Sequence, residues 1–405
     1  RAHGGGDNAK IGIAIWRCLN TIVWFSLPVF GLPWFFSWLM GYYSVGEEQS
    51  YLFAVEPDRV EANVVALDVG KAALQAEIER FRTDLERGRI DRRLEKALLP
   101  ARRLSERLLA PVADQLARAD RLLILADGPL HSLPFAALTD PTTANRRRFL
   151  IESMPLHRAA SATVFARLKQ ERDERRATRL AAFGDPHYPT SLAPNGQAAP
   201  PSPPLQAALR GGLDLKPLPA TRSEILALAQ LYPQTAQVYL GAEATEGRAK
   251  TVGRETTHLH IASHGLLDDR FPLDSALALT IPSSWREGDD NGLLQAWEIF
   301  EQVRIDADLV TLSACDTGRG KVLGGEGLIG LTRAFQYAGA RSVLASLWGV
   351  GDHSTAELMQ RFYRSLEQGE PKAEALRRAQ LELLHGAEYS HPFHWAGFEL
   401  VGDWR

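Results

Sequence analysis

Strand-forming and helix-forming segments alternate over the last part of the chain, and this order restricts the folds that it can adopt. The expected strands are short and apolar on both faces, and the expected helices carry apolar residues three and four positions apart. The strands are expected at 236–240, 257–262, 308–313 and 341–348, and the helices at 221–232, 325–340 and 355–369. A strand that is apolar on both faces must be covered twice, and helices on both sides of a parallel sheet do this. The sequence therefore predicts an α/β fold with a largely parallel sheet between two layers of helices.

The preceding part of the chain is also predicted to be an α/β unit. Within residues 70–120, apolar side chains recur at helical spacing, so one face of this region is expected to be buried. These side chains are Leu74, Ile78, Phe81 and Leu85. Strands are expected at 50–55, from Arg121 and at 180–186.

A stretch dense in Pro, Gly, Ser and Ala separates these two regions and is expected to be a linker or an exposed loop. The length of 405 residues accommodates one large α/β unit built of two halves. The predicted division is an apolar N-terminal segment at 1–43, an N-terminal α/β half at 44–190, the linker at 191–218 and a second α/β half at 219–405.

The charge balance and the cysteine content exclude some classes of function. Lys and Arg total 46 against 49 Asp and Glu, a net charge of −3, so no broad basic field favours direct binding of nucleic acid. The two cysteines, Cys18 and Cys315, lie in such different contexts that we expect no structural disulfide between them. The expected absence of a disulfide indicates a protein of a reducing compartment, so we expect the folded part to lie in the cytoplasm.

An apolar segment without charged side chains, residues 18–46, is long enough to cross a bilayer, which takes roughly 20 apolar residues. Lys10 precedes it, and aromatic residues gather toward its end as they do at a membrane interface. Pro28 and Pro33 also allow a kinked, re-entrant or surface-lying segment, or a loop packed on the domain. Membrane association through this segment is one of two open interpretations.

Two reactive residue types follow neighbouring strands of the predicted sheet. His264 follows the strand at 257–262, and Cys315 follows the strand at 308–313. Reactive groups of open α/β sheets collect beyond the carboxyl ends of the strands. A thiol becomes a good nucleophile when a neighbouring imidazole takes its proton. The pair is therefore a candidate catalytic dyad, although a buried cysteine and a structural histidine are the simpler interpretations of each residue alone.

Small residues around this pair suit an acyl-transfer site. Gly265 lets the backbone approach a substrate carbonyl, and Ser313 leaves space beside the sulfur. The backbone N–H groups of Gly265 and Cys315 are the expected donors to an oxyanion.

Several ordered blocks of the sequence resemble the CHAT domain, a caspase-like peptidase module related to separases and caspases. The resemblance covers roughly residues 42–403. The blocks include "GYYSVGEEQSYLFAV", "ILADGPLHSLPFAAL", "LIESMPLHRAASATV", "PLPATRSEI", "LGAEATE", "HLHIASHG", "LVTLSACDTGRG", "GGEGLIGLTRAFQYAGARSVLASLWGVGDHSTAELMQRFYRSLEQG" and "HPFHWAGFELVGD".

This resemblance implies a caspase-like three-layer sandwich in two halves, of which only the second carries a dyad. It implies that His264 is the general base and Cys315 the nucleophile of a cysteine endopeptidase, which needs no cofactor. The family's usual block has Glu after the cysteine, whereas this sequence has Asp316. Protein or peptide substrates and control by a regulatory protein or an upstream region are the expected partners.

Asp352, Asp316 and Ser313 are the expected substrate-binding residues. In the related separases an acid in a block similar to "SLWGVGD" receives arginine, so Asp352 is a candidate for selecting Arg or Lys before the cut bond. Asp352 also directly precedes a helix-forming segment, where an Asp is a good helix cap. These two roles stay open. An anion at Asp316, next to the sulfur, would oppose formation of the thiolate.

Other classes of site are less well supported by the residues. His258, His260 and His264 form an H-x-H-x3-H run, but no Asp accompanies His264 at the spacing of zinc hydrolases, so no metal is expected. The loop "GRGKVLGGEG" fails both phosphate-binding glycine patterns. A non-catalytic CHAT-fold interaction module anchored at a membrane and a different thiol acyl-transfer enzyme remain as alternatives.

Overall fold

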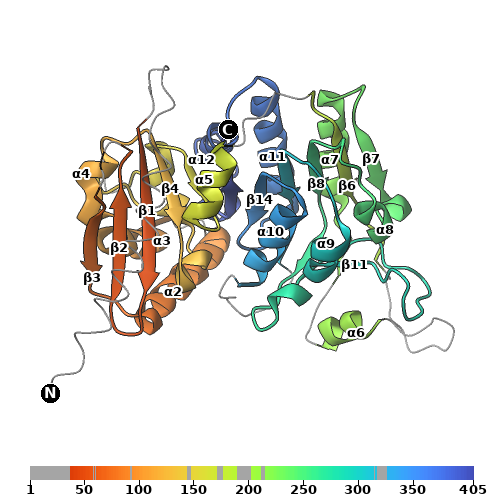
Figure 1. Cartoon of the computed structure of the whole chain (residues 1–405), viewed down its shortest axis with the longest axis horizontal. Coiled ribbons are helices and arrows are strands. Elements are labelled where there is room, and N and C mark those ends of the chain that lie inside the picture. Colours follow the sequence, from red (N-terminus) through yellow and green to blue (C-terminus); the bar gives the residue numbers. More distant parts are fainter. Residues whose placement is uncertain are drawn as a thin grey trace.

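The chain folds into two α/β halves that lie side by side around one continuous sheet (Figure 1). The computed structural model describes residues 37–57, 59, 61–91, 94–143, 147–170, 177–188, 202–210, 215–313, 315–316 and 326–405. The strands that the structure describes form an eleven-stranded sheet and a four-stranded sheet.

The large sheet has the order β3-β2-β1-β4-β5-β15-β14-β12-β8-β6-β7. Its strands are β1 (Trp38–Val45), β2 (Ser50–Val55), β3 (Asn63–Leu67), β4 (Arg121–Leu125), β5 (Leu156–Arg158), β6 (Leu180–Gly184), β7 (Gln237–Leu240), β8 (His258–Ile261), β12 (Leu309–Leu312), β14 (Ser342–Ser346) and β15 (Phe398–Gly402). Neighbours are parallel at β1–β4, β4–β5, β5–β15, β14–β12, β12–β8, β8–β6 and β6–β7. The prediction of a largely parallel sheet is confirmed.

The small sheet lies beyond the ends of β8 and β12 and has the order β11-β10-β9-β13. Its strands are β9 (His264–Leu266), β10 (Ala276–Ala278), β11 (Leu293–Gln295) and β13 (Cys315–Asp316). Two residues separate the end of β8 from the start of β9, and two residues separate the end of β12 from the start of β13. The small sheet is therefore an extension of the two central strands of the second half.

Helices cover both faces of the large sheet, as the predicted three-layer sandwich requires (Figure 1). They are α2 (Lys71–Asp91), α3 (Leu94–Leu108), α4 (Ala113–Leu116), α5 (Ala162–Gln170), α7 (Pro219–Leu231), α8 (Glu246–Lys250), α9 (Ala296–Gln302), α10 (Glu326–Ala338), α11 (Asp352–Glu367) and α12 (Lys372–Leu384). A further helix, α6 (Pro203–Arg210), lies apart from the large sheet (Figure 1), and its Leu205 packs with residues of the small sheet. The apolar face predicted for residues 70–120 is buried, because Leu74, Ile78, Phe81 and Leu85 are at most 1% exposed.

One hydrophobic core runs across both halves on the face covered by α2, α3, α7, α11 and α12. Phe149 of the first half meets Trp395 of the second at 5.3 Å between ring centroids. A separate core on the opposite face belongs to the second half and includes residues of α8, α9 and α10. The two halves thus share a core on one face.

The boundaries of the halves differ from the predicted division at two places. β1 begins at Trp38, inside the segment 1–43 that was set apart, because an apolar run with aromatic residues is continuous with a strand buried on both faces. β6 lies before the predicted linker yet pairs with β7 and β8 of the second half.

The apolar segment that suggested a membrane span lies mostly outside the described residues. Residues 18–36 are not described, and residues 38–45 of that segment form β1. In the part of the chain that the structure describes, no helix has the length and hydropathy of a bilayer span. The predicted linker at 191–218 is also described only in part, and α6 lies within it.

Candidate active site

The two residues of the predicted dyad are partners in neighbouring strands. β9 and β13 pair in parallel, with Cys315 opposite His264 and Asp316 opposite Gly265. The register follows from the large sheet, where Leu312 at the end of β12 is opposite Ile261 at the end of β8. Because both strands continue for a few residues in step, the backbone positions of the two reactive groups meet at one edge of the sheet.

His264 is buried and packs against Tyr188. The histidine is 4% exposed, and its ring lies 5.1 Å from the ring of Tyr188, measured between centroids. Its backbone N–H donates to the Tyr188 hydroxyl at 3.3 Å, and that hydroxyl donates to the Ala278 carbonyl at 2.7 Å. Tyr188 therefore fastens β9 to β10 and lies against the imidazole.

The second nitrogen of the imidazole is fixed by a backbone group. His264 Nε2 lies 2.7 Å from the carbonyl oxygen of Lys216. A carbonyl only accepts hydrogen bonds, so Nε2 carries the proton of the neutral ring and Nδ1 is the basic nitrogen. Such a contact fixes both the tautomer and the orientation of the ring.

Lys216 was missed by the sequence analysis because it acts through its backbone and lies in the predicted linker. Apolar side chains attach this part of the chain to the small sheet. Leu205 of α6 is 1% exposed and packs in a cluster with Tyr188, and Leu215 is half-buried against the same cluster. Pro217 follows Lys216 and restricts its backbone to extended conformations.

Asp352 caps a helix, but not the helix that it begins. It is the first residue of α11, whose N-cap is Gly351, and its Oδ2 accepts the Ala220 N–H at the start of α7 at 3.0 Å. Burial raises the pKa of the Asp352 carboxyl, the hydrogen bond from the Ala220 N–H acts to lower it, and the nearby charge of Glu224 acts to raise it.

The remaining predicted site residues lie at the same edge of the sheet. Ser313 is 3% exposed, its N–H donates to the Ile261 carbonyl at 3.0 Å, and its hydroxyl has no hydrogen-bond partner among the described residues. Gly265 and Asp316 are strand partners. Most of the glycine-rich loop, residues 317–325, is outside the described residues.

The other two histidines of the H-x-H-x3-H run are tied to protein side chains. His260 Nε2 lies 2.7 Å from Glu224 Oε1 and its Nδ1 lies 3.2 Å from the Tyr363 hydroxyl. His258 Nδ1 lies 3.1 Å from the Thr257 hydroxyl, and burial lowers its pKa to about 4. Within the described ranges, no three His, Cys, Asp or Glu side chains group in a way that would hold a metal ion.

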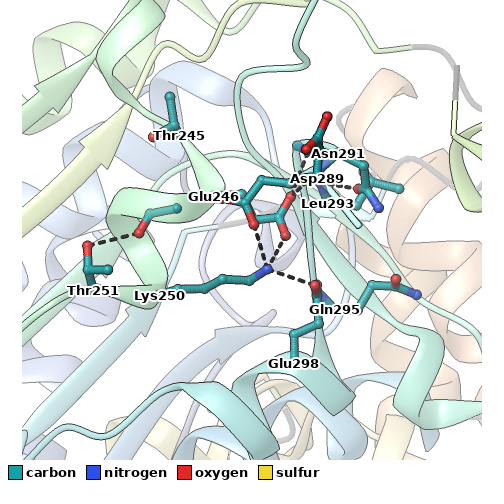
Figure 2. A network of polar contacts seen from close by, with 12 residues as sticks. Thr245, Glu246, Lys250, Thr251, Asp289, Asn291, Leu293, Gln295 and Glu298 are labelled. Atoms are coloured by element: carbon teal, nitrogen blue, oxygen red, sulfur yellow. Dashed lines mark hydrogen bonds and ion pairs between the residues drawn. The ribbon is translucent and has the colours of Figure 1, made fainter. Parts of the chain in front are cut away.

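An ion network supports the outer part of the small sheet (Figure 2). Lys250 Nζ contacts Glu246 and lies 2.8 Å from both Asp290 Oδ1 and Glu298 Oε1. Glu246 Oε2 accepts the N–H groups of residues 291 and 292, which lead into β11. Burial alone would lower the pKa of Lys250, but its hydrogen bonds to the three carboxylates raise it. Burial raises the pKa of Glu246 to about 7, against the opposing effect of Lys250.

The family model for the CHAT domain matches residues 98–403. The chain belongs to the CHAT domain family. Two curated proteins match this CHAT domain, tetratricopeptide repeat protein 28 of Mus musculus at 26% identity and that of Homo sapiens at 27%. Each alignment spans 343 residues, or 75% of this chain and 13% of the relative. The chain thus corresponds to a small part of these relatives.

The fold of this CHAT domain is also that of a separase. A crystal structure of the Saccharomyces cerevisiae separase–securin complex at 2.6 Å resolution matches with a TM-score of 0.59 and 8% sequence identity. The match covers 97% of this chain and 31% of that chain. A second structure of the same complex, at 3.0 Å resolution, matches with a TM-score of 0.56. The caspase-like fold predicted from the sequence is confirmed.

Proposed function

We propose that this CHAT domain is a cysteine endopeptidase that cleaves protein substrates through a dyad of Cys315 and His264. The observation that carries the proposal is the pairing of these two residues across β13 and β9. The Lys216 carbonyl supports it, because this contact leaves Nδ1 of His264 as the nitrogen that accepts a proton.

In the proposed mechanism, His264 Nδ1 takes the proton of the Cys315 thiol and the sulfur attacks the carbonyl carbon of the peptide bond. Backbone N–H groups of Gly265 and Cys315 donate to the oxyanion. The tetrahedral intermediate collapses when His264 gives its proton to the leaving amine, which leaves a thioester on Cys315. Water, deprotonated by His264, then hydrolyses the thioester and restores the thiol.

We further propose that Asp352 selects an Arg or Lys side chain before the cut bond. Asp352 begins α11, with five residues between it and the end of β14, and it uses one oxygen, Oδ2, to accept the Ala220 N–H. A guanidinium forms paired hydrogen bonds with a carboxylate, so Arg is preferred over Lys. The cap on α7 and the recognition of a basic side chain are compatible in this arrangement.

Control of the activity by a protein partner or by an upstream region belongs to the same proposal. A peptidase without restraint would cleave cellular proteins, and the separase that shares this fold was solved in a complex with securin.

The test is cleavage of a peptide library by the wild type, Cys315→Ala and His264→Ala, each with and without a chelator. The proposal predicts cleavage after basic residues by the wild type and a loss of at least about 100-fold in each variant. It also predicts that the chelator has no effect. Cleavage by Cys315→Ala that stops with the chelator would establish a metal site instead. No cleavage and no labelling of Cys315 by an electrophilic peptide would favour the interaction module.

A further inference from the structure

A buried arginine of the first half reaches into the second half and contacts the segment that follows β14. Arg82 lies on α2 and is 5% exposed. Its Nη2 donates to the Leu347 carbonyl at 2.9 Å, and its guanidinium carbon lies 6.0 Å from the centroid of the Trp348 ring. A hydrogen bond from a charged donor and a cation over an indole are both stronger in a buried site than in water.

The two residues that Arg82 contacts begin the segment that leads to Asp352. Residues 347–351 connect the end of β14 to the start of α11 and have no helical or strand structure of their own. Trp348 is 4% exposed, its Nε1 donates to the Phe393 carbonyl at 3.0 Å, and its carbonyl accepts the Ser346 hydroxyl at 2.6 Å. The position of Asp352 thus depends on a short segment anchored at its beginning.

A second buried arginine where the two halves meet, Arg158, is bound to other partners. Arg158 forms an ion pair of 2.6 Å with the carboxyl of Glu399. It also donates hydrogen bonds to the backbone carbonyls of residues 131 and 133. The guanidinium of Arg158 therefore binds β15 and backbone groups of the first half. Of these two buried cations, Arg82 is the one that contacts the Leu347 carbonyl.

We propose that Arg82 is a positioning residue for substrate recognition, through which the half that lacks the dyad fixes the segment 347–352 and with it Asp352. This inference rests on the proposed role of Asp352 in binding a basic side chain. It gives the first half a part in selecting the substrate without placing any of its residues on the substrate.

A second arginine–tryptophan contact between the two halves provides a matched control for the variant of Arg82. Arg121 at the start of β4 is 4% exposed and its guanidinium carbon lies 3.3 Å from the centroid of the Trp404 ring. Trp404 follows β15, whose last residue is opposite Ser342 at the beginning of β14, whereas Leu347 follows the end of β14. The two contacts lie at opposite ends of β14, so only the Arg82 contact is next to the segment 347–352.

The test measures binding of an acetylated peptide with a single arginine to the full chain in a Cys315→Ala background. The variants are Arg82→Met, Arg82→Lys and Arg121→Met, each with a thermal unfolding curve. Arg82→Met is expected to weaken binding about 10-fold, and Arg82→Lys, which keeps one charged donor, less. Arg121→Met is expected to bind as the background protein does. Hydrogen exchange of the amides of residues 347–352 is expected to accelerate about 10-fold in Arg82→Met alone.

Binding without chemistry separates this inference from the proposed peptidase activity. If the chain with Cys315 cuts no peptide but the binding and exchange results hold, the peptidase proposal fails and the role of Arg82 stands. If Arg82→Met binds the peptide as tightly as the background protein, or if Arg121→Met weakens binding equally, Arg82 is a general stabilising residue and the inference is overturned. Absence of peptide binding in the background protein also overturns it.

Discussion

Cys315 and His264 are opposite one another in parallel strands, although β10, β11, α9 and β12 lie between them in the chain. Their approach depends on two strands of the large sheet ending in step and continuing into the small sheet. The proposed dyad therefore lies on regular backbone structure, which holds reactive groups more accurately than a loop does.

Replacing Asp352 by Asn separates its two roles. The amide oxygen of Asn keeps an acceptor for the Ala220 N–H, so the cap on α7 is retained and the melting temperature is expected to change little. The negative charge is lost, and cleavage of a peptide with Arg before the cut bond is expected to fall about 10- to 100-fold, since a charge-assisted pair is replaced by a neutral contact. Equal cleavage by Asp352→Asn would leave only the capping role.

The Lys216 carbonyl is tested through its neighbour. Pro217→Gly relaxes the restriction on Lys216 and is expected to lower kcat about 2- to 5-fold, from the added backbone freedom of the segment that orients His264. KM should be unchanged, because the carbonyl contacts the base and not the substrate. Lys216→Ala keeps the carbonyl and is the control. A loss of kcat in Lys216→Ala as large as in Pro217→Gly would show that the side chain matters.

The sequence predicts those residues of the candidate site that act through their side chains. The positions of His264 and Cys315 after apolar strands indicate their proximity because parallel strands end at a common edge. Lys216 acts through its backbone carbonyl, so the identity of its side chain does not indicate the role. Its segment is rich in Pro and Gly, and the sequence therefore predicts a linker there. Arg82 lies in a charged helical region, and its contact with the Leu347 carbonyl joins two parts of the chain that are 265 residues apart.

Stability is expected to fall as the pH drops below about 6.5, because several imidazoles are buried in their neutral form. Burial is the main cause that lowers the pKa of His157 to about 3, and the charge of Arg121 adds to it. The unfolded chain takes up a proton below pH 6.5 and the folded chain does not, so the free energy of unfolding decreases by about 1.4 kcal/mol per pH unit for such a group. Above pH 6.5 the imidazole is neutral in both the folded and the unfolded chain, so the stabilisation from its buried neutral form is fully present.

His157→Leu is expected to reduce this slope between pH 6.5 and 4, as measured by urea unfolding at a series of pH values. His187→Leu removes an imidazole from an exposed position and is the control. An unchanged slope in His157→Leu would contradict the burial of a neutral ring at this position.

Lys250 is expected to stabilise the outer part of the small sheet. Lys250→Met leaves Glu246 and Glu298, whose side chains are 1% and 8% exposed, without their shared cation. We expect a loss of about 3 kcal/mol in the free energy of unfolding. The double variant Lys250→Met with Glu246→Gln should recover part of this loss, because the amide oxygen still accepts the N–H groups of residues 291 and 292. A double variant less stable than Lys250→Met would contradict this account of the network.

The measurement that tests the dyad most directly is the rate of alkylation of Cys315 by iodoacetamide as a function of pH, followed by mass spectrometry in the wild type and in His264→Ala. If His264 accepts the thiol proton, the wild type reacts with an apparent pKa well below about 8.5, the value of a free cysteine, and His264→Ala shifts the profile toward that value. Superimposable profiles in the two proteins would contradict the pairing of sulfur and imidazole on which the peptidase proposal depends.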